Sequence, residues 1–221
     1  MKNARDIAGA LLRVCVVSKT GYLARTVRPD LLQRAAARAD ALMAEAFCTI
    51  YELPADIFTA DASPLERLAA RRARLPTSMA GCGLRSVADT SAAAYVASWR
   101  AHAPELAPDD QALLRAALMP QLDGDTAMEA APPCFTGLAA AVGRLLPLLE
   151  GDIRAELSPA SFTSAAPADV QRKLTHAVEQ TARRTADEET AASLAPEEAT
   201  TLRAFLNSCD GHWLRAARLP H

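Results

Sequence analysis

The chain has 221 residues and a formal net charge of −2, and half of its residues are hydrophobic although only 5% are aromatic. So small a net charge excludes an overall electrostatic attraction to nucleic acid or to an anionic membrane. The hydrophobic residues are mainly Ala and Leu, which favour helices, and residues that favour strands are scarce. The composition therefore excludes an extensive sheet and predicts an all-α protein of one large or two small domains.

The first predicted element is a helix from about Ala4 to Val17, followed by a weak point at 18–21 and a short helical piece over 22–27. If one straight helix ran through both pieces, Lys19 would lie within its apolar stripe, where a charge is costly. We therefore expect a bend at 18–21.

A long helix is predicted over 31–51, because Pro29 stops the preceding element and Asp30 provides a cap. The apolar residues at helical spacing define its expected core face. They are Leu32, Ala35, Ala39, Leu42, Met43, Ala46 and Ile50.

A connector over 52–63 leads to the next predicted helix. Ser63, Pro64 and Glu66 stand in the order of an N-cap, a first-turn proline and a capping-box glutamate. This helix is expected to end at Pro76.

Gly81 and Gly83 predict a turn at 80–86 that is determined by the backbone. A phosphate-binding loop would need a helix directly behind the glycines and usually a Lys. Here 84–88 separates them from a helix that Asp89 or Thr90 would cap. The expected inner face of that helix is Ala92, Tyr95, Val96 and Trp99.

The remaining chain alternates predicted helices with Pro-rich or Gly-rich connectors. The helices span about 110–119, 135–157 (kinked at Pro147), 169–185 and 196–208, with a short one around Trp213, and the connectors are 120–133 and 158–167. The expected fold is an irregular multi-helix bundle or array of eight or nine helices. Its expected parts are a helical segment at 1–53, a helical region at 64–119 containing the glycine turn at 80–86, and a C-terminal helical region at 134–221.

Sequence signatures of catalysis are absent: the chain has no GxSxG, HExxH, GxxxxGK[ST] or GxGxxG motif. The acidic runs Asp109–Asp110 and 187–189 are typical of solvated charge near helix ends. His176 has no nucleophile nearby in sequence that it could activate. We therefore expect no catalytic residue, no cofactor and no enzymatic activity.

The five cysteines are scattered, which indicates reduced thiols and not a disulfide framework. Cys209 and His212 have ligand-like spacing, but a zinc site needs further ligands, so no metal site is expected. Asp6 and Arg13 interrupt the apolar N-terminal run, and no charge-free stretch approaches 18 apolar residues. The expected location is intracellular, in cytoplasm or nucleus, without secretion or membrane association.

The charge is distributed unevenly along the chain. Through Ser86 there are 13 Lys and Arg against 8 Asp and Glu, whereas the remainder has 11 against 18. A basic N-terminal part is compatible with contact to nucleic acid, and a solvated surface of mixed charge is the simpler alternative.

The stretch LLRVCVVSKTGYLARTVRPD, from Leu11 to Asp30, resembles the segment after the polymerase palm in reverse transcriptases of non-LTR (LINE-type) retrotransposons. That family has Leu-Leu-Arg, a short break, and then Asn-Tyr-Leu-x-Arg-Thr-x-x-Pro, and this chain has Gly21 in place of the Asn. The family's later motif, with glycines before Leu-Arg-Ser, corresponds to LPTSMAGCGLRS, with Ala80 for the first glycine and Cys82 for a leucine. Downstream, AAYVASW and VQRKLTHAVE also resemble the family.

The resemblance implies a C-terminal part of such a protein, in which the helical segment at 1–53 is thumb-like and is followed by the helical region after the thumb. The aromatic–Ala–Asp–Asp box that holds two metal ions in the polymerase is missing, so the resemblance implies a truncated or relic reading frame that cannot polymerise. A thumb grips the template–primer backbone, which implies weak, sequence-independent contact with RNA or DNA. By their position in the thumb-like segment, the residues expected to make this contact are Lys19, Tyr22, Arg25 and Arg28, with Arg85 after the glycine turn.

Structural roles compete with this interpretation. Arg25 and Arg28 near a helix C-terminus would interact favourably with its dipole, and Tyr22 would belong to the core. The alternative function is a helical protein–protein interaction or scaffold protein with no nucleic-acid role, and a third is a small-molecule binder. An exposed apolar patch would favour the scaffold, whereas clustered arginines and salt-sensitive binding would favour nucleic acid.

Overall fold

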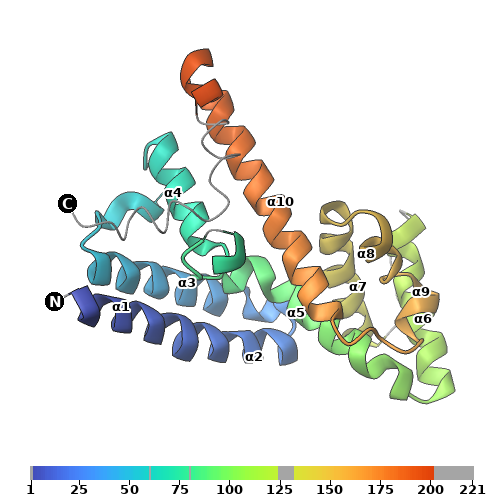
Figure 1. Ribbon diagram of the computed structural model, residues 1–221. Helices are drawn as coiled ribbons and strands as arrows, with labels where there is room; N and C mark the ends of the chain where they lie inside the picture. Colours follow the sequence, from blue (N-terminus) through green and yellow to red (C-terminus); the bar gives the residue numbers. More distant parts are fainter. Residues whose placement is uncertain (1, 60, 80, 124–131, 202–221) are drawn as a thin grey trace. The chain divides into compact units, whose positions relative to one another are not determined.

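The structure, a computed structural model, describes residues 2–59, 61–79, 81–123 and 132–201 (Figure 1). Within these ranges every regular element is helical, and no strand occurs. The prediction of an all-α array is thus confirmed.

Ten α-helices lie wholly within the described residues. They are α1 (Lys2–Leu11), α2 (Ser18–Thr26), α3 (Pro29–Tyr51), α4 (Pro64–Arg74), α5 (Val87–His102), α6 (Pro108–Asp123), α7 (Pro133–Leu145), α8 (Gly151–Ala155), α9 (Pro159–Phe162) and α10 (Val170–Ser193). A π-helical segment, Leu12–Val17, joins α1 to α2, and short 3-10 segments lie at Ala55–Phe58, Thr77–Met79, Ala103–Glu105 and Leu146–Leu148. A further helix begins at Pro196, as predicted, and is described to residue 201.

The chain divides into two compact units. Unit 1 comprises the described residues of 2–18, 38–86 and 179–201, and unit 2 comprises 19–37 and the described residues of 87–178. This division differs from the expected parts at 1–53, 64–119 and 134–221. The expectation followed Pro-rich and Gly-rich connectors along the chain, whereas each unit groups elements by their packing.

Unit 2 is built around α7, which packs against both α5 and α6. The predicted apolar face of 135–157 is confirmed, because Leu138, Val142, Leu145, Leu146 and Leu149 are all buried. Pro147 does not kink a long helix; instead α7 ends at Leu145 and a 3-10 turn follows. A proline inside a helix removes one backbone donor and clashes with the preceding turn, so the α-helix stops there.

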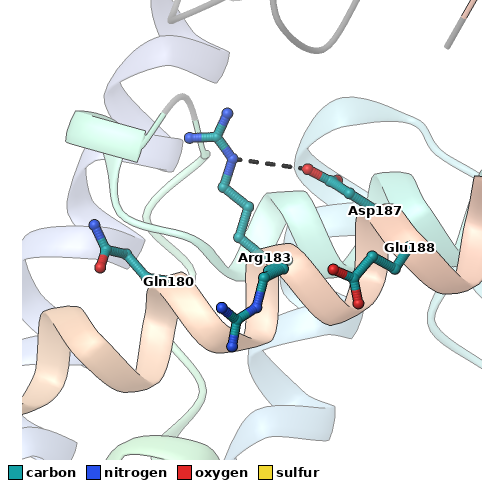
Figure 2. A pocket seen from close by; sticks show the side chains of 5 residues that line it. Gln180, Arg183, Asp187 and Glu188 are labelled. Atoms are coloured by element: carbon teal, nitrogen blue, oxygen red, sulfur yellow. Dashed lines mark ion pairs between the residues drawn. The ribbon is translucent and has the colours of Figure 1, made fainter. Parts of the chain in front are cut away.

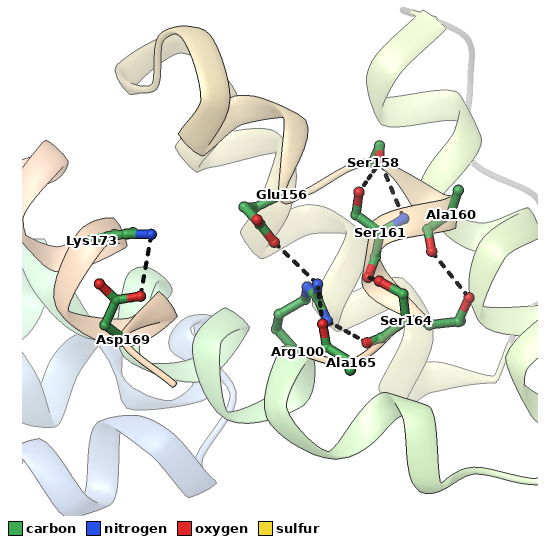
Figure 3. A network of polar contacts seen from close by, with 10 residues as sticks. Arg100, Glu156, Ser158, Ala160, Ser161, Ser164, Ala165, Asp169 and Lys173 are labelled. Atoms are coloured by element: carbon green, nitrogen blue, oxygen red, sulfur yellow. Dashed lines mark hydrogen bonds and ion pairs between the residues drawn. The ribbon is translucent and has the colours of Figure 1, made fainter. Parts of the chain in front are cut away.

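An almost fully buried arginine, Arg100 on α5, forms hydrogen bonds with the connector 158–167 of unit 2 (Figure 3). Its Nη1 donates to the Ser164 carbonyl at 2.7 Å, and its Nη2 donates to Glu156 Oε2 at 3.1 Å and to the Ala165 carbonyl at 3.4 Å. The connector is therefore fixed in place by charge-assisted hydrogen bonds.

Unit 1 contains α4, whose predicted capping box is confirmed. The Ser63 side chain accepts from the Glu66 backbone, and the Glu66 side chain accepts from the Ser63 backbone at 2.7 Å. The last turn of α4 is basic, and Arg72 donates to both carboxylate oxygens of Asp187 on α10, at 3.0 and 3.1 Å. The acidic run at 187–189 therefore includes an interhelical ion-pair partner, which corrects its interpretation as solvated charge.

The predicted bend at 18–21 is absent, because the chain is helical without a break from residue 2 to 26. The prediction assumed a buried stripe around Lys19, but Val16, Tyr22 and Leu23 of that stripe are exposed. A charge beside exposed side chains stays in water, so the helix continues at no desolvation cost.

The segment Ala4–Thr26 is long and apolar enough to cross a membrane, judged by length and composition alone. It carries Arg13 and Lys19, and it lies near the N-terminus. Core helices of soluble proteins and signal sequences meet the same criterion.

The core face of α3 differs from the predicted one. Ala35 and Leu42 are exposed, whereas Asp40 is buried and accepts a hydrogen bond from Ser86 Oγ at 2.7 Å. The prediction assigns only apolar residues to this face, whereas the buried face of α3 includes the hydrogen-bonded carboxylate of Asp40. The buried residues are Leu32, Ala36, Asp40, Met43, Ala44, Phe47 and Cys48.

Two other predicted boundaries shift. The connector expected at 120–133 begins later, since α6 continues through Pro120 to Asp123. The helix expected from 169 to 185 extends as α10 to Ser193. The predicted element around Trp213, and the pair Cys209 and His212, lie outside the described residues.

Candidate nucleic-acid interface

Helix α2 presents three of the predicted contact residues to solvent: Lys19, Tyr22 and Arg25. The Tyr22 residue is 66% exposed, which corrects its assignment to the core. Within the described part of the chain, none of these three side chains makes a hydrogen bond or an ion pair. The helix contains no acidic residue. Its two cations are therefore available to an anionic ligand.

Arg28, in contrast, is held by its neighbours in unit 2. Its guanidinium donates two hydrogen bonds to the Asp30 carboxylate, from Nε at 3.2 Å and from Nη2 at 2.7 Å. Its Nη1 donates to the Pro133 carbonyl at 3.2 Å. The hydrogen bond with Arg28 lowers the pKa of the Asp30 carboxyl. Arg28 also lies over Gly137, where a Cβ would approach Arg28 Nε to 2.7 Å. This arginine links the start of α3 to α7, so its guanidinium is less available to a phosphate than the side chains of Lys19 and Arg25 are.

Arg85 belongs to unit 1 and faces a buried carboxylate. Arg85 Nε lies 2.9 Å from Glu179 Oε1, and the side-chain exposures are 47% and 6%. The separation is that of an ion pair, and Glu179 Oε1 accepts no hydrogen bond from the described residues. Burial raises the pKa of Glu179, and the Arg85 charge opposes that shift. Removing Arg85 would leave Glu179 buried without this counter-charge, so its role here is structural.

The glycine segment forms the predicted backbone-determined turn. Gly83 has a φ of +76°, and its N–H donates to the Leu75 carbonyl at 2.9 Å. Gly81 is required for space, because a Cβ there would lie 2.0 Å from the Leu75 carbonyl oxygen. The next helix begins at Val87, earlier than the predicted cap at Asp89 or Thr90.

The two sequence stretches that carry the family resemblance meet at this turn. A Cβ on Gly83 would lie 2.9 Å from Arg13 Cδ, so the aliphatic part of Arg13 covers the glycine. Cys82 is partly buried beside it, and this burial raises the pKa of its thiol. Arg13 of the Leu-Leu-Arg motif and Gly83 of the glycine motif are thus in contact within unit 1.

Two hollows lie along α10 in unit 1, and the sequence patterns did not indicate them. One, of about 390 Å³, is lined by Gln180, Arg183, Arg184, Asp187 and Glu188 (Figure 2). The other, of about 250 Å³, is lined by residues of α4 and α10. In the first hollow Arg183 Nε faces Asp187 Oδ2 at 3.8 Å, and two basic side chains balance two acidic ones. Such a balance does not favour a polyanion.

No three His, Cys, Asp or Glu side chains are grouped as a metal site would require, among the residues that the structure describes. Comparisons with protein-family models, with curated proteins and with solved structures found no match to this chain. The family resemblance therefore rests on the sequence motifs alone. The described structure itself defines an all-α protein with an exposed cationic helix face on α2.

Proposed function

We propose that the chain is a non-catalytic, thumb-like part of a retrotransposon reverse-transcriptase protein, and that α2 makes weak, sequence-independent contact with nucleic-acid backbones. The observation that carries this proposal is the face formed by Lys19, Tyr22 and Arg25, which is exposed and lacks polar partners among the described residues. Positive side chains free of internal ion pairs can neutralise phosphates and release counterions.

The contact between Arg13 and Gly83 supports the proposed ancestry, because it joins the two motifs of the resemblance. The proposal assigns phosphate contact to fewer residues than the sequence analysis predicted. Arg28 and Arg85 are engaged in ion pairs, so we assign phosphate contact to Lys19 and Arg25.

The test is a fluorescence anisotropy titration of the full chain against labelled DNA and RNA at several salt concentrations. Two phosphate contacts predict a slope of log K against log salt of about −1.4 on single strands and about −1.8 on duplex DNA. The double variant Lys19→Glu/Arg25→Glu should weaken binding to all sequences alike, since phosphate contacts carry no base information.

A matched control reverses two exposed arginines of the same unit that lie outside α2, Arg144→Glu/Arg154→Glu. It makes the same change in net charge and should leave most of the affinity intact. Equal losses in both double variants would show only a dependence on net charge and would contradict a contact at α2.

The scaffold alternative has one specific observation in its favour. Ile7, Leu11, Val14 and Val16, all in the N-terminal helix of unit 1, are large apolar residues that are between 41% and 69% exposed. Contiguous exposed apolar surface is typical of protein–protein interfaces. If the chain bound no nucleic acid at low salt but self-associated or captured a protein partner, and Val14→Asp abolished that association, this second function would replace the first.

A further inference from the structure

We propose that the α2 face prefers single-stranded over duplex nucleic acid, with a base stacked on Tyr22 between two phosphates held by Lys19 and Arg25. This inference rests on the proposed function and specifies its ligand. Its basis is the position of an exposed aromatic ring between two unpaired cations.

The spacing along α2 is regular. Lys19, Tyr22 and Arg25 follow one another at three-residue steps, so each is displaced by about 4.5 Å along the axis and by about 60° around it. Tyr22 therefore lies between the two cations on one side of the helix. A strand running along this side would meet a cation, a ring and a cation in succession.

The ring is the feature that distinguishes the two ligands. A contact limited to the backbone of a duplex is made by cations and hydrogen-bonding polar atoms, and it gains nothing from an aromatic face. The bases of a duplex are stacked on each other, whereas those of a single strand are free to stack on an aromatic side chain. Basic grooves with interleaved aromatic residues are typical of proteins that bind single strands without sequence preference.

The surroundings of Tyr22 leave its ring accessible. The residue is 66% exposed, and its hydroxyl has no hydrogen-bond partner among the described residues. Gly21 precedes it, and apart from its chain neighbours and the nearby backbone of its own helix, no atom of the described residues lies within 4 Å of a Cβ on Gly21. The neighbouring Thr26 hydroxyl points back to the Tyr22 and Leu23 carbonyls, at 3.3 and 3.4 Å. That side of the helix is therefore open to a planar base.

The test compares a labelled oligo-dT strand with a duplex of equal length, in anisotropy titrations of the full chain. Tyr22→Ala should weaken binding to the single strand about five- to tenfold, the lower part of the range measured for stacking on aromatic residues, and should leave duplex binding unchanged. Tyr22→Phe keeps the ring and should retain the preference. Leu23→Ala removes a neighbouring exposed apolar side chain and should change neither affinity.

The outcomes separate this inference from the proposed function. If Lys19→Glu/Arg25→Glu abolishes binding while Tyr22→Ala has no effect, or weakens both ligands equally, the stacking inference is wrong and backbone contact stands. If the wild-type chain binds neither ligand at low salt, both proposals fail. Because Tyr22 is exposed, Tyr22→Ala should fold normally, and an unchanged circular dichroism spectrum verifies this.

Discussion

Replacing Gly83 by Ala tests the turn on which both family motifs converge. The φ of +76° places an alanine in the left-handed region, which costs about 1–2 kcal/mol for a residue with a Cβ. The new Cβ would also lie 2.9 Å from Arg13 Cδ, but this atom belongs to a flexible side chain that can move away. We therefore expect the free energy of unfolding to fall by about 1–2 kcal/mol, nearly all of it from the backbone.

Three other glycines provide the matched series. Gly151→Ala combines a positive φ of +53° with open space and should cost about 1 kcal/mol, whereas Gly21→Ala, inside α2, should stabilise by about 0.8–1.0 kcal/mol. Gly81→Ala places a Cβ 2.0 Å from a backbone carbonyl, which cannot move independently, and should cost about 3 kcal/mol or more.

Urea denaturation followed by far-UV circular dichroism measures the whole glycine series. The reasoning is refuted if Gly83→Ala stabilises as Gly21→Ala does, because the turn would then have no left-handed residue. A loss at Gly83 as large as that at Gly81 would also refute it, since the contact with Arg13 would then be rigid.

Three further predictions follow from buried and exposed groups. Arg100→Met should lower the free energy of unfolding by about 2–3 kcal/mol in urea denaturation, because two carbonyls and a carboxylate lose a charged donor; a loss below 0.5 kcal/mol would contradict the network. Burial raises the pKa of the Glu179 carboxyl above its ordinary value of 4.5. The folded state therefore binds the carboxyl proton more tightly than the unfolded state does, and this contribution to stability is lost as the pH rises above 4.5. Glu179→Gln should therefore gain stability relative to wild type as the pH is raised from 4.5 towards neutrality, and a constant difference in urea denaturation would disprove this. In native-state thiol labelling read by peptide mass spectrometry, exposed Cys15 and Cys134 should react well before buried Cys48, and the reverse order would contradict the fold.

Local chemistry explains which parts of the fold were predictable. The Ala-rich and Leu-rich composition, the capping box at Ser63 and Glu66, and the apolar face of α7 all depend on residues within a few positions of one another. The structure confirms each of them. The prediction for the buried face of α3 was wrong because Asp40 is buried there. Its carboxylate accepts a hydrogen bond from Ser86, which is 46 residues away in sequence.

The same distinction applies to the candidate site. The exposure of Lys19 and Arg25 follows from their type, since long charged side chains rarely bury fully. The partners of Arg28 and Arg85 include the Pro133 carbonyl and Glu179, which are brought close only by tertiary folding. No local pattern indicates which cations are already paired.

The ion pairs of unit 1 have a consequence for deletion mapping. Arg71, Arg72 and Arg85 precede residue 87, yet each is paired with an acidic side chain from residue 179 onwards. Cutting the chain between these stretches would leave three arginines without counter-charges and would make the surface around them more basic. An N-terminal fragment would then adhere to any polyanion, including heparin or ribosomal RNA, through groups that are neutralised in the intact protein. Point substitutions in the full-length chain avoid this artefact, whereas truncation would create the very activity it was meant to locate.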